Sequence, residues 1–185
     1  MKLALAIIAK DEREQLSRII ADYGHYFDEI CIAVDDEEVC DYLVRRASLP
    51  ENSNDSKLKV FRYQWQDDFS HKRNFLAENV ESEYYFRMDT DDDIVNPENI
   101  KKIFDKTIKT DADCIYVPYI YGKDEDGNCI AKHWRETIIK KREGVHWKKR
   151  IHENIFVEDQ DTFKGAKDDS ISILHKQEPG HAERS

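Results

Sequence analysis

Four short apolar runs, separated by segments with helical spacing, constrain the fold of this chain more than any other feature. The runs cover residues 3–9, 29–34, 58–63 and 84–88. A continuous apolar run is typical of a strand buried on both faces of a sheet. Strands that alternate with helices predict an α/β fold with a mainly parallel, Rossmann-like sheet and helices on both of its faces.

The segments between the runs carry helix signals. Leu16, Ile19 and Ile20 recur at helical spacing after the first run. Gly24 then stands where a helix would stop. Pro97 suits the first turn of a later helix. Helices are therefore expected over residues 12–24, 37–47, 69–80 and 97–109.

The second half of the chain has the signals of a small antiparallel addition to this sheet. Residues 114–121 and 128–134 flank Asp124-Glu125-Asp126-Gly127, which is a hairpin signal. Short strands are also expected over residues 136–140 and 171–174, whereas the stretch between them has few periodic signals. The second half should therefore pair its strands differently from the first.

The length of 185 residues suits one domain with a core of its own. We expect that domain over residues 1–177, followed by a loose tail over residues 178–185. A longer, multidomain protein is expected to continue from the tail. The apolar stretch at the N-terminus is interrupted at once by charged residues, so we interpret it as a buried first strand rather than a signal peptide.

Charge and cysteine usage narrow the class of protein. The formal net charge of −10 makes nucleic acid an unexpected partner. No apolar run is long enough to span a membrane. The four cysteines, at positions 31, 40, 114 and 129, form no Cys-x-x-Cys pair. They are typical of reduced core thiols, which predicts a cytoplasmic protein rather than a zinc site or a disulfide framework.

A cluster of carboxylates follows the fourth apolar run. Asp89, Asp91, Asp92 and Asp93 come directly after Met88. So much negative charge at the end of a strand is costly unless a cation neutralises it. Carboxylate oxygens suit Mg²⁺ or Mn²⁺, and these ions commonly bridge to substrate phosphates. The alternative is a solvated acidic turn, and the segment alone does not decide between the two.

Two other polar clusters lie at equivalent places in the predicted sheet. Residues 10–12 follow the first apolar run, and residues 35–36 follow the second. Ligands of open α/β sheets gather at the carboxyl ends of the strands. The convergence of three polar strand ends therefore favours a metal-assisted ligand site over the acidic turn.

Several motifs point to a family when they are taken in order. They are Ala9-Lys10-Asp11-Glu12, Phe27-Asp28-Glu29-Ile30, the run from Trp65-Gln66-Asp67-Asp68-Phe69-Ser70 to Asn74, Met88-Asp89-Thr90-Asp91-Asp92, the run from Arg135 to Lys140, and Trp147-Lys148-Lys149-Arg150-Ile151-His152-Glu153. Together they resemble family 2 glycosyltransferases with the GT-A fold, in particular a bacterial group often fused to helical repeats. The resemblance runs from Leu3 to about His175.

The resemblance implies roles for the first-half motifs. Ala9, Asp11 and Glu12 would contact the nucleotide-sugar, and Asp35 would bind the nucleotide base. The family usually has a small-residue turn after the aspartate of the second strand, and this chain has Asp36-Glu37 instead. The implied division is a nucleotide-binding half over residues 1–96 and an acceptor-side half over residues 97–177.

The aspartates and two basic residues receive implied roles in the same way. Asp91 would ligate the metal, and Asp89 would contact the ribose or the metal through water. His175, after the last apolar run, would complete the metal shell, although a surface histidine is equally compatible with its position. Arg73 would contact the diphosphate, and its alternative is an ordinary ion pair on a helix surface.

Transfer of a sugar with inversion, which the family implies, needs a base that deprotonates the acceptor hydroxyl. Glu153 is our first candidate, with Asp92 and Asp93 as competitors. The structural alternative for Glu153 is a salt bridge to a neighbouring basic residue. His152 is expected to orient a loop or the donor phosphates. Arg150 stands where the family often has glycine, which would recharge the acceptor side.

The function that we expect is a metal-dependent transfer of a sugar from a nucleotide-sugar, in particular a UDP-sugar, with Mn²⁺ or Mg²⁺ as cofactor. The acceptor is unidentified. The basic stretch over residues 140–150, with Trp147 inside it, is either a solvated hairpin or a contact for an anionic glycan or polymer. Two alternatives are a nucleotide-sugar-binding module without turnover and a nucleotidyltransferase, although residues 10–14 lack the glycine-rich phosphate loop of the latter.

Overall fold

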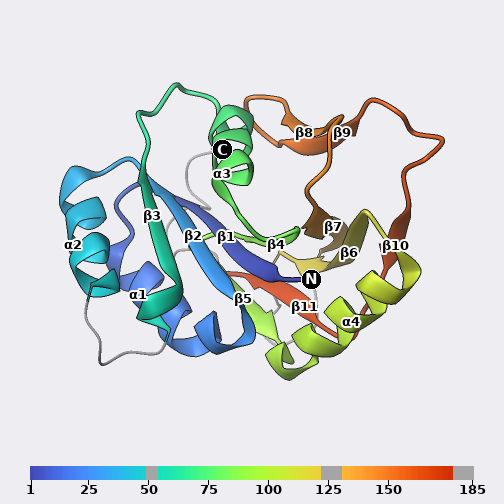
Figure 1. The fold of residues 1–185 in the computed structure, drawn as a ribbon, viewed down its shortest axis with the longest axis horizontal. Coiled ribbons are helices and arrows are strands. Elements are labelled where there is room, and N and C mark those ends of the chain that lie inside the picture. Colours follow the sequence, from blue (N-terminus) through green and yellow to red (C-terminus); the bar gives the residue numbers. More distant parts are fainter. Residues whose placement is uncertain (49–53, 122–130, 177–185) are drawn as a thin grey trace.

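The computed structural model describes residues 1–48, 54–121 and 131–176. The first half contains β1 (Leu3–Ala9), α1 (Arg13–Tyr23), β2 (Glu29–Val34), α2 (Glu37–Ala47), β3 (Leu58–Arg62), α3 (Phe69–Asn79), β4 (Tyr84–Met88) and β5 (Asp92–Val95). The second half contains α4 (Ile100–Thr110), β6 (Cys114–Ile120), β7 (Lys132–Lys140), β8 (Val145–Lys148), β9 (Asn154–Val157), β10 (Gly165–Lys167) and β11 (Ser172–His175). Figure 1 shows their arrangement around one large sheet.

The large sheet has the strand order β3-β2-β1-β4-β7-β6-β11-β5, with β10 beside β6. The first four strands are parallel to one another. The chain moves outward from β1 to β3 and then returns to place β4 on the other side of β1. This reversal opens a crevice at the carboxyl ends of β1 and β4, which is where open α/β sheets bind ligands.

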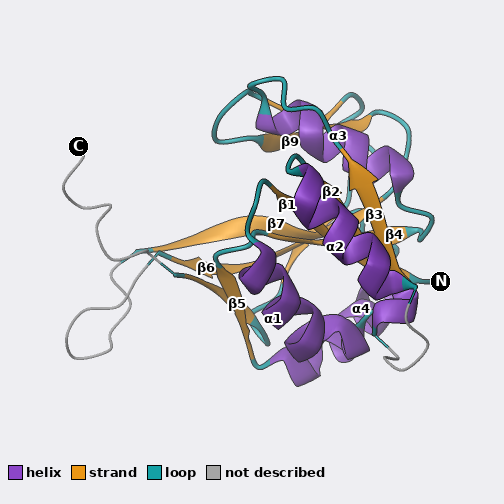
Figure 2. Cartoon of the chain, turned by 90° about the vertical axis from the view of Figure 1, so that its left-hand side faces the viewer, coloured by secondary structure: helices purple, strands orange, loops and turns teal. Residues whose placement is uncertain are grey.

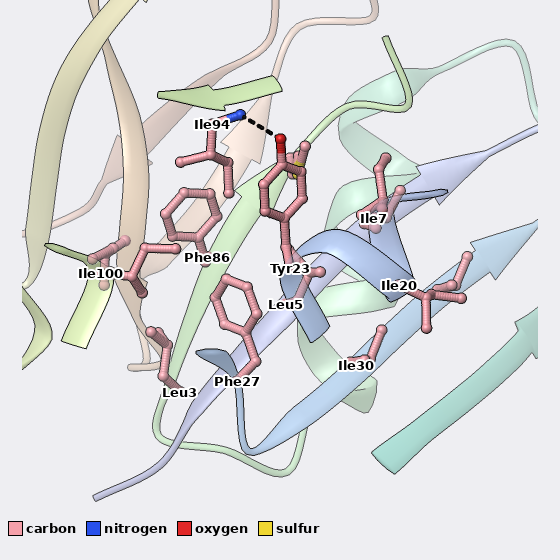
Figure 3. Packing of buried hydrophobic residues seen from close by; sticks show 14 of the residues in the cluster. Leu3, Leu5, Ile7, Ile20, Tyr23, Phe27, Ile30, Phe86, Ile94 and Ile100 are labelled. Atoms are coloured by element: carbon pink, nitrogen blue, oxygen red, sulfur yellow. Dashed lines mark hydrogen bonds between the residues drawn. The ribbon is translucent and has the colours of Figure 1, made fainter. Parts of the chain in front are cut away.

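Two hydrophobic cores lie on opposite faces of the sheet. Because successive side chains of a strand alternate in direction, β1 sends Leu3, Leu5 and Ile7 into one core and small residues such as Ala4 and Ala6 into the other. The larger core packs against α1, α2 and α4 (Figure 3). The smaller core packs against α3 and the β8–β9 hairpin (Figure 2). The predicted helices on both faces are thus confirmed.

Aspartate side chains fix where two of the helices begin. Asp36 accepts a hydrogen bond from the backbone N–H of Val39 at the start of α2. Asp68 accepts one from the backbone N–H of His71 at the start of α3. Such caps satisfy backbone donors that have no partner inside the helix, and each stabilises a helix by roughly 1 kcal/mol. Helix α2 therefore starts directly after the carboxyl end of β2, and α3 starts after the loop that follows β3.

The acidic segment after β4 differs from the simple turn that was the alternative to a ligand site. Asp92 and Asp93 open strand β5, which runs antiparallel to β11. The backbone N–H of Ile94 in this strand donates to the Tyr23 hydroxyl of α1 (Figure 3). Alternation along β5 buries Asp92 and turns Asp93 the other way, toward Arg18 and Lys176.

The second half departs from the sequence-based expectations in detail. Strand β7 is one long strand where two short strands were expected, and it pairs antiparallel with both β4 and β6. The small β8–β9 sheet and strand β10 were not predicted, because strands of only three or four residues are too short to give a clear pattern. The expected hairpin turn at residues 124–127 and the tail at 178–185 lie outside the described residues.

Two simpler expectations can also be compared with the structure. Cys31, Cys40 and Cys114 are buried free thiols, as predicted, and Cys129 lies outside the described residues. Among the helices in the described part of the chain, none has the length and apolar character needed to cross a membrane.

Candidate active site

A cavity of about 610 Å³ opens at the carboxyl ends of β1, β2 and β4. Cavities of this size hold small ligands in many proteins. Its walls come from both halves of the chain. The lining residues that carry polar or charged groups are Lys10, Glu12, Asp35, Lys72, Arg73, Arg87, Asp89, Thr90, Asp91, Tyr119, Tyr121, Arg135, His152, Glu153 and His175.

One end of the cavity holds a buried ion pair between Asp35 and Lys72. Lys72 Nζ lies 2.7 Å from Asp35 Oδ1, and it also donates to the backbone carbonyl of Ala9 at 2.6 Å. Burial lowers the pKa of Lys72, although the nearby Asp35 carboxylate opposes this shift. Asp35 keeps 16% of its side-chain surface exposed to the cavity. The pair joins β1, β2 and α3 at one point and leaves a carboxylate facing the ligand space.

The middle of the cavity holds a compact network of arginines and carboxylates. Arg73 Nε donates to Glu153 Oε1 at 2.6 Å, and Arg73 Nη2 donates to Asp89 Oδ1 at 2.6 Å. Arg87 Nη2 donates to the other oxygen of Asp89, and it lies 3.9 Å from Glu153 Oε1. Burial opposes the charge on Asp89, but Arg73 and Arg87 outweigh it and hold the pKa of this carboxyl well below its usual range.

A third group contains Asp91, Asp92 and His175. Strand pairing places His175 directly opposite Asp92 in the β5–β11 register. His175 Nδ1 lies 3.5 Å from Asp91 Oδ2 and 3.4 Å from Asp92 Oδ1. The Tyr119 hydroxyl donates to Asp92 Oδ1 at 2.6 Å and lies 3.0 Å from His175 Nδ1. His175, which is near the end of the described chain, therefore lies close to the carboxyl end of β4.

This third group is short of positive charge. Within the described residues, no lysine or arginine forms an ion pair with Asp91 or Asp92. Burial, together with the neighbouring Asp92 and Asp89, raises the pKa of Asp91. The hydrogen bond to Asp92 and the charge of Asp91 raise the pKa of His175. Both shifts have the direction expected where carboxylates are crowded together without a permanent cation.

The donor atoms of this group fit a divalent cation. One ligand atom from each of Asp91, Asp92 and His175 can be chosen so that all lie within 4.8 Å of one another. Two carboxylates and one imidazole suit Mn²⁺, and carboxylates suit Mg²⁺. The sequence-based ligand set was Asp91, Asp89 and His175, whereas Asp89 here is bonded to Arg73 and Arg87. In the described residues Asp92 occupies the place in the cluster that was expected for Asp89.

The three candidate bases occupy different positions. Glu153 lines the cavity and is held by Arg73. Asp92 is 1% exposed and lies behind the cavity wall, where Tyr119 covers it. Asp93 faces Arg18 and Lys176 on the outer side of β5 and does not line the cavity. Of the three, Glu153 is the carboxylate that a ligand in the cavity could reach.

The loop before Glu153 is unusual in its backbone. His152, which lines the cavity, has φ of 56°, and Lys149 has φ of 83°. Non-glycine residues seldom adopt this left-handed region, and they do so mostly where surrounding contacts hold them. Arg150 provides such a contact, because its Nε donates to the Asp67 carbonyl at 2.9 Å. Its side chain thus ties two loops together and does not line the cavity.

The structure brings most of the predicted site residues to one cavity. Two do not line the cavity: Asp11, which is exposed, and Asp92, which is buried behind its wall. Sequence reasoning overlooked Lys72, Arg87 and Tyr119, and it gave Arg135 no role. A signal existed for Arg87, which is a charged residue inside an otherwise apolar strand. Lys72 and Tyr119 had no distinctive local pattern.

Comparisons with known proteins fit this geometry. The sequence profile of glycosyl transferase family 2 matches residues 5–159. No curated protein has a significant sequence match to the chain.

Solved structures give a second comparison. TarS 1-349 of S. aureus in complex with UDP is 14% identical, with a TM-score of 0.53 over 71% of this chain and 38% of TarS 1-349. Its complex with UDP-GlcNAc gives 15% identity and a TM-score of 0.52 over 71% of this chain and 37% of that one. HddC from Yersinia pseudotuberculosis is 10% identical, with a TM-score of 0.50 over 95% of this chain and 93% of HddC. The chain therefore spans well under half of TarS 1-349, and the likeness shows the fold, which is the predicted GT-A type.

Proposed function

Because the chain belongs to glycosyl transferase family 2, we propose that it transfers a sugar from a UDP-sugar to an acceptor and depends on a divalent cation. The observation that carries the proposal is the grouping of three polar clusters around one cavity at the switch point of the sheet. In this proposal the three clusters would supply a contact for a nucleobase, a place for a cation and a reachable carboxylate. The structural neighbours bound to UDP and to UDP-GlcNAc support the choice of donor.

Asp35 and Lys72 would hold the nucleobase. A carboxylate accepts hydrogen bonds, and the uracil ring carries one N–H donor that a carboxylate can bind. Lys72 neutralises Asp35 from the protein side and fixes its orientation. The carbonyl of Ala9 is already bonded to Lys72, so the same lysine also holds the end of β1 in place.

Asp91, Asp92 and His175 would hold Mn²⁺ or Mg²⁺, and Asp89 lies at the same strand end. A bound cation would supply the positive charge that stabilises a diphosphate leaving group. Tyr119 keeps Asp92 and His175 oriented through its hydroxyl. Arg73 keeps the carboxylates of Asp89 and Glu153 at fixed places on the cavity wall.

Glu153 is our proposed base for a transfer with inversion. It lines the cavity, and its position is fixed by Arg73 on α3. To accept a proton from an acceptor hydroxyl, the carboxylate must use the oxygen that Arg73 does not bind. His152 precedes it on the strained loop and would orient the donor phosphates.

The acceptor would approach across the rim of the cavity. Trp65, Phe69 and Ile151 line the cavity and are 39%, 42% and 66% exposed. Aromatic rings of this kind pack on the apolar faces of sugars, so an acceptor glycan fits the rim. Lys148 at the end of β8 and Lys149 in the loop that follows would favour an anionic glycan or polymer. We also propose the division into a nucleotide-binding half over 1–96 and an acceptor-side half over 97–177.

A turnover assay tests the proposal. The full chain is incubated with a panel of UDP-sugars, with Mn²⁺ or with a chelator, and released UDP is measured. We expect slow UDP release that requires the cation and that is lost in Asp91→Asn. Asp105→Asn, an exposed change on α4, serves as the control and should behave as the unchanged protein.

The other outcomes separate the alternatives. UDP binding that needs the cation, with no release of UDP for any sugar or acceptor, would support a binding module without turnover. Release of pyrophosphate from a nucleoside triphosphate would support a nucleotidyltransferase. Failure to bind UDP at any cation concentration would contradict the proposal outright.

A further inference from the structure

Arg87 is the one charged residue in strand β4. The other residues of the strand, Tyr84, Tyr85, Phe86 and Met88, are buried and largely apolar. Arg87 is also buried, with 5% of its side chain exposed, and it lines the cavity. Removing a guanidinium from water costs several kcal/mol unless partners compensate it, so an arginine in such a strand calls for a partner.

In the middle of the cavity the arginines outnumber the carboxylates, although the whole lining, taken over the described residues, holds five lysines and arginines and five aspartates and glutamates. Three arginines, Arg73, Arg87 and Arg135, line the middle of the cavity, and two carboxylates, Asp89 and Glu153, lie among them. Arg73 binds both carboxylates. Arg87 shares Asp89, and Arg135 donates to the Tyr121 hydroxyl, which carries no charge.

One atom of Arg87 also lacks a hydrogen-bond partner in the described part of the chain. Arg87 Nε is buried and has no hydrogen-bond partner within the described residues. A buried donor without a partner destabilises the folded state. An anion that reaches this part of the cavity would satisfy the atom and balance the surplus charge, whereas a neutral oxygen would satisfy the hydrogen bond alone.

The strand order places this surplus at the sugar end of the donor. Asp35, the proposed base contact, follows β2, and the strands continue in the order β2, β1, β4, β7. Arg87 belongs to β4 and Arg135 to β7. A nucleotide-sugar that starts at Asp35 and crosses the cation site at Asp91 therefore presents its sugar toward Arg87 and Arg135.

We propose that Arg87 and Arg135 form a subsite for a carboxylate on the transferred sugar, so that the donor is a UDP-hexuronic acid rather than a neutral UDP-hexose. This inference rests on the proposed function. A guanidinium binds a carboxylate through two parallel hydrogen bonds, and its planar geometry selects this group over a hydroxyl. Arg87 is thus a residue that determines specificity.

Calorimetric titration in the presence of Mn²⁺ tests the subsite. UDP, UDP-glucose, UDP-galactose, UDP-glucuronic acid and UDP-galacturonic acid are compared on the full chain. At least one acid should bind tenfold or more tightly than its neutral counterpart. In Arg87→Met this preference should fall to about onefold, whatever the absolute affinities. Arg87→Lys keeps the charge without the planar group and should retain a smaller preference.

Arg62→Met is the matched control, because Arg62 is an exposed arginine of β3 that pairs with Glu37 and Asp41 outside the cavity. It should leave the preference unchanged. Equal binding of acids and neutral sugars by the unchanged protein would overturn the subsite while UDP binding upheld the proposed function. A preference that survives Arg87→Met in a folded variant would overturn it too. Absence of UDP binding would overturn both proposals.

Discussion

Two neighbouring groups of carboxylates share this cavity, and they solve the problem of buried negative charge in opposite ways. Asp89 and Glu153 are compensated by the protein, through Arg73 and Arg87. Asp91 and Asp92 have no such arginine among the described residues and are joined instead by His175 and Tyr119. The carboxylates of the first group are balanced without a ligand, whereas we propose that a cation from outside balances those of the second.

The difference separates residues that build the site from residues that use it. A compensated carboxylate holds its arginine in place and stabilises the fold. Its removal should therefore lower the free energy of unfolding. An uncompensated carboxylate destabilises the fold slightly. Its removal should therefore weaken ligand binding rather than lower the stability of the fold. Four changes can break or sharpen this distinction.

The largest effect is expected from Asp91→Asn. The change removes a proposed cation ligand without removing an ion pair, so UDP-sugar turnover should fall by roughly a thousandfold. Thermal unfolding of the cation-free protein should stay the same or shift upward, because one repelling charge is gone. Turnover is measured by UDP release and stability by circular dichroism. A marked loss of stability would show that Asp91 belongs with the compensated group.

Arg73→Met should act in the opposite manner. It leaves Glu153 without its principal partner and Asp89 with Arg87 alone, both in a buried site. The free energy of unfolding should fall by about 3 kcal/mol, measured by urea denaturation. Arg62→Met, with the same exchange at an exposed ion pair, should cost less than about 1 kcal/mol. Equal losses in the two variants would remove the distinction between the groups.

His175→Gln tests the link between the cation group and the second half of the chain. The variant keeps a polar side chain but loses the imidazole donor, and Mn²⁺ affinity should fall roughly tenfold to a hundredfold. The β5–β11 pairing is made by the backbone and should persist. Unchanged Mn²⁺ affinity would exclude His175 as a ligand.

Glu29 offers a third way to hold a buried carboxylate, through hydrogen bonds outside the cavity. Burial raises the pKa of Glu29, but hydrogen bonds from Ser82 and the Glu81 backbone outweigh it and hold the pKa at about 2. A folded-state pKa below the unfolded value contributes stability that is present above the unfolded pKa and is lost as the pH falls toward the folded one.

Glu29→Gln should therefore destabilise the protein by roughly 1–2 kcal/mol near neutral pH, and the difference from the unchanged protein should shrink between about pH 4.5 and pH 2. Urea unfolding at a series of pH values measures it. If the difference does not depend on pH in this range, then the shape of the Glu29 side chain, and not its charge, stabilises the fold.

The fold of the first half could be predicted because its local signals agree with its tertiary structure. The run of β1 is wholly apolar, those of β2 and β4 each hold one charged residue, and α1 has regular apolar spacing. The family motifs gave the GT-A fold and most of the cavity, and the family match confirms that resemblance. The roles of the individual residues remain predictions.

The rest depended on contacts that no local pattern contains. Strand β5 begins with two aspartates, and only its pairing with β11 makes it a strand and brings His175 to Asp92. Lys72 sits on α3 among polar neighbours, and its burial follows from the approach of α3 to the ends of β1 and β2. Arg87 was visible as a charge in an apolar run, but its surplus over the carboxylates appears only when Arg73, Arg135 and Glu153 converge.

The central claim is that a divalent cation binds beside Asp91 and Asp92 and couples to UDP in the same cavity. Electron paramagnetic resonance of Mn²⁺, titrated with the protein in the presence and absence of UDP, measures this coupling directly. We predict one bound Mn²⁺ per chain, at least tenfold tighter with UDP than without it, and no such binding in Asp91→Asn. Mn²⁺ binding that UDP does not affect, or that Asp91→Asn retains, would contradict the account.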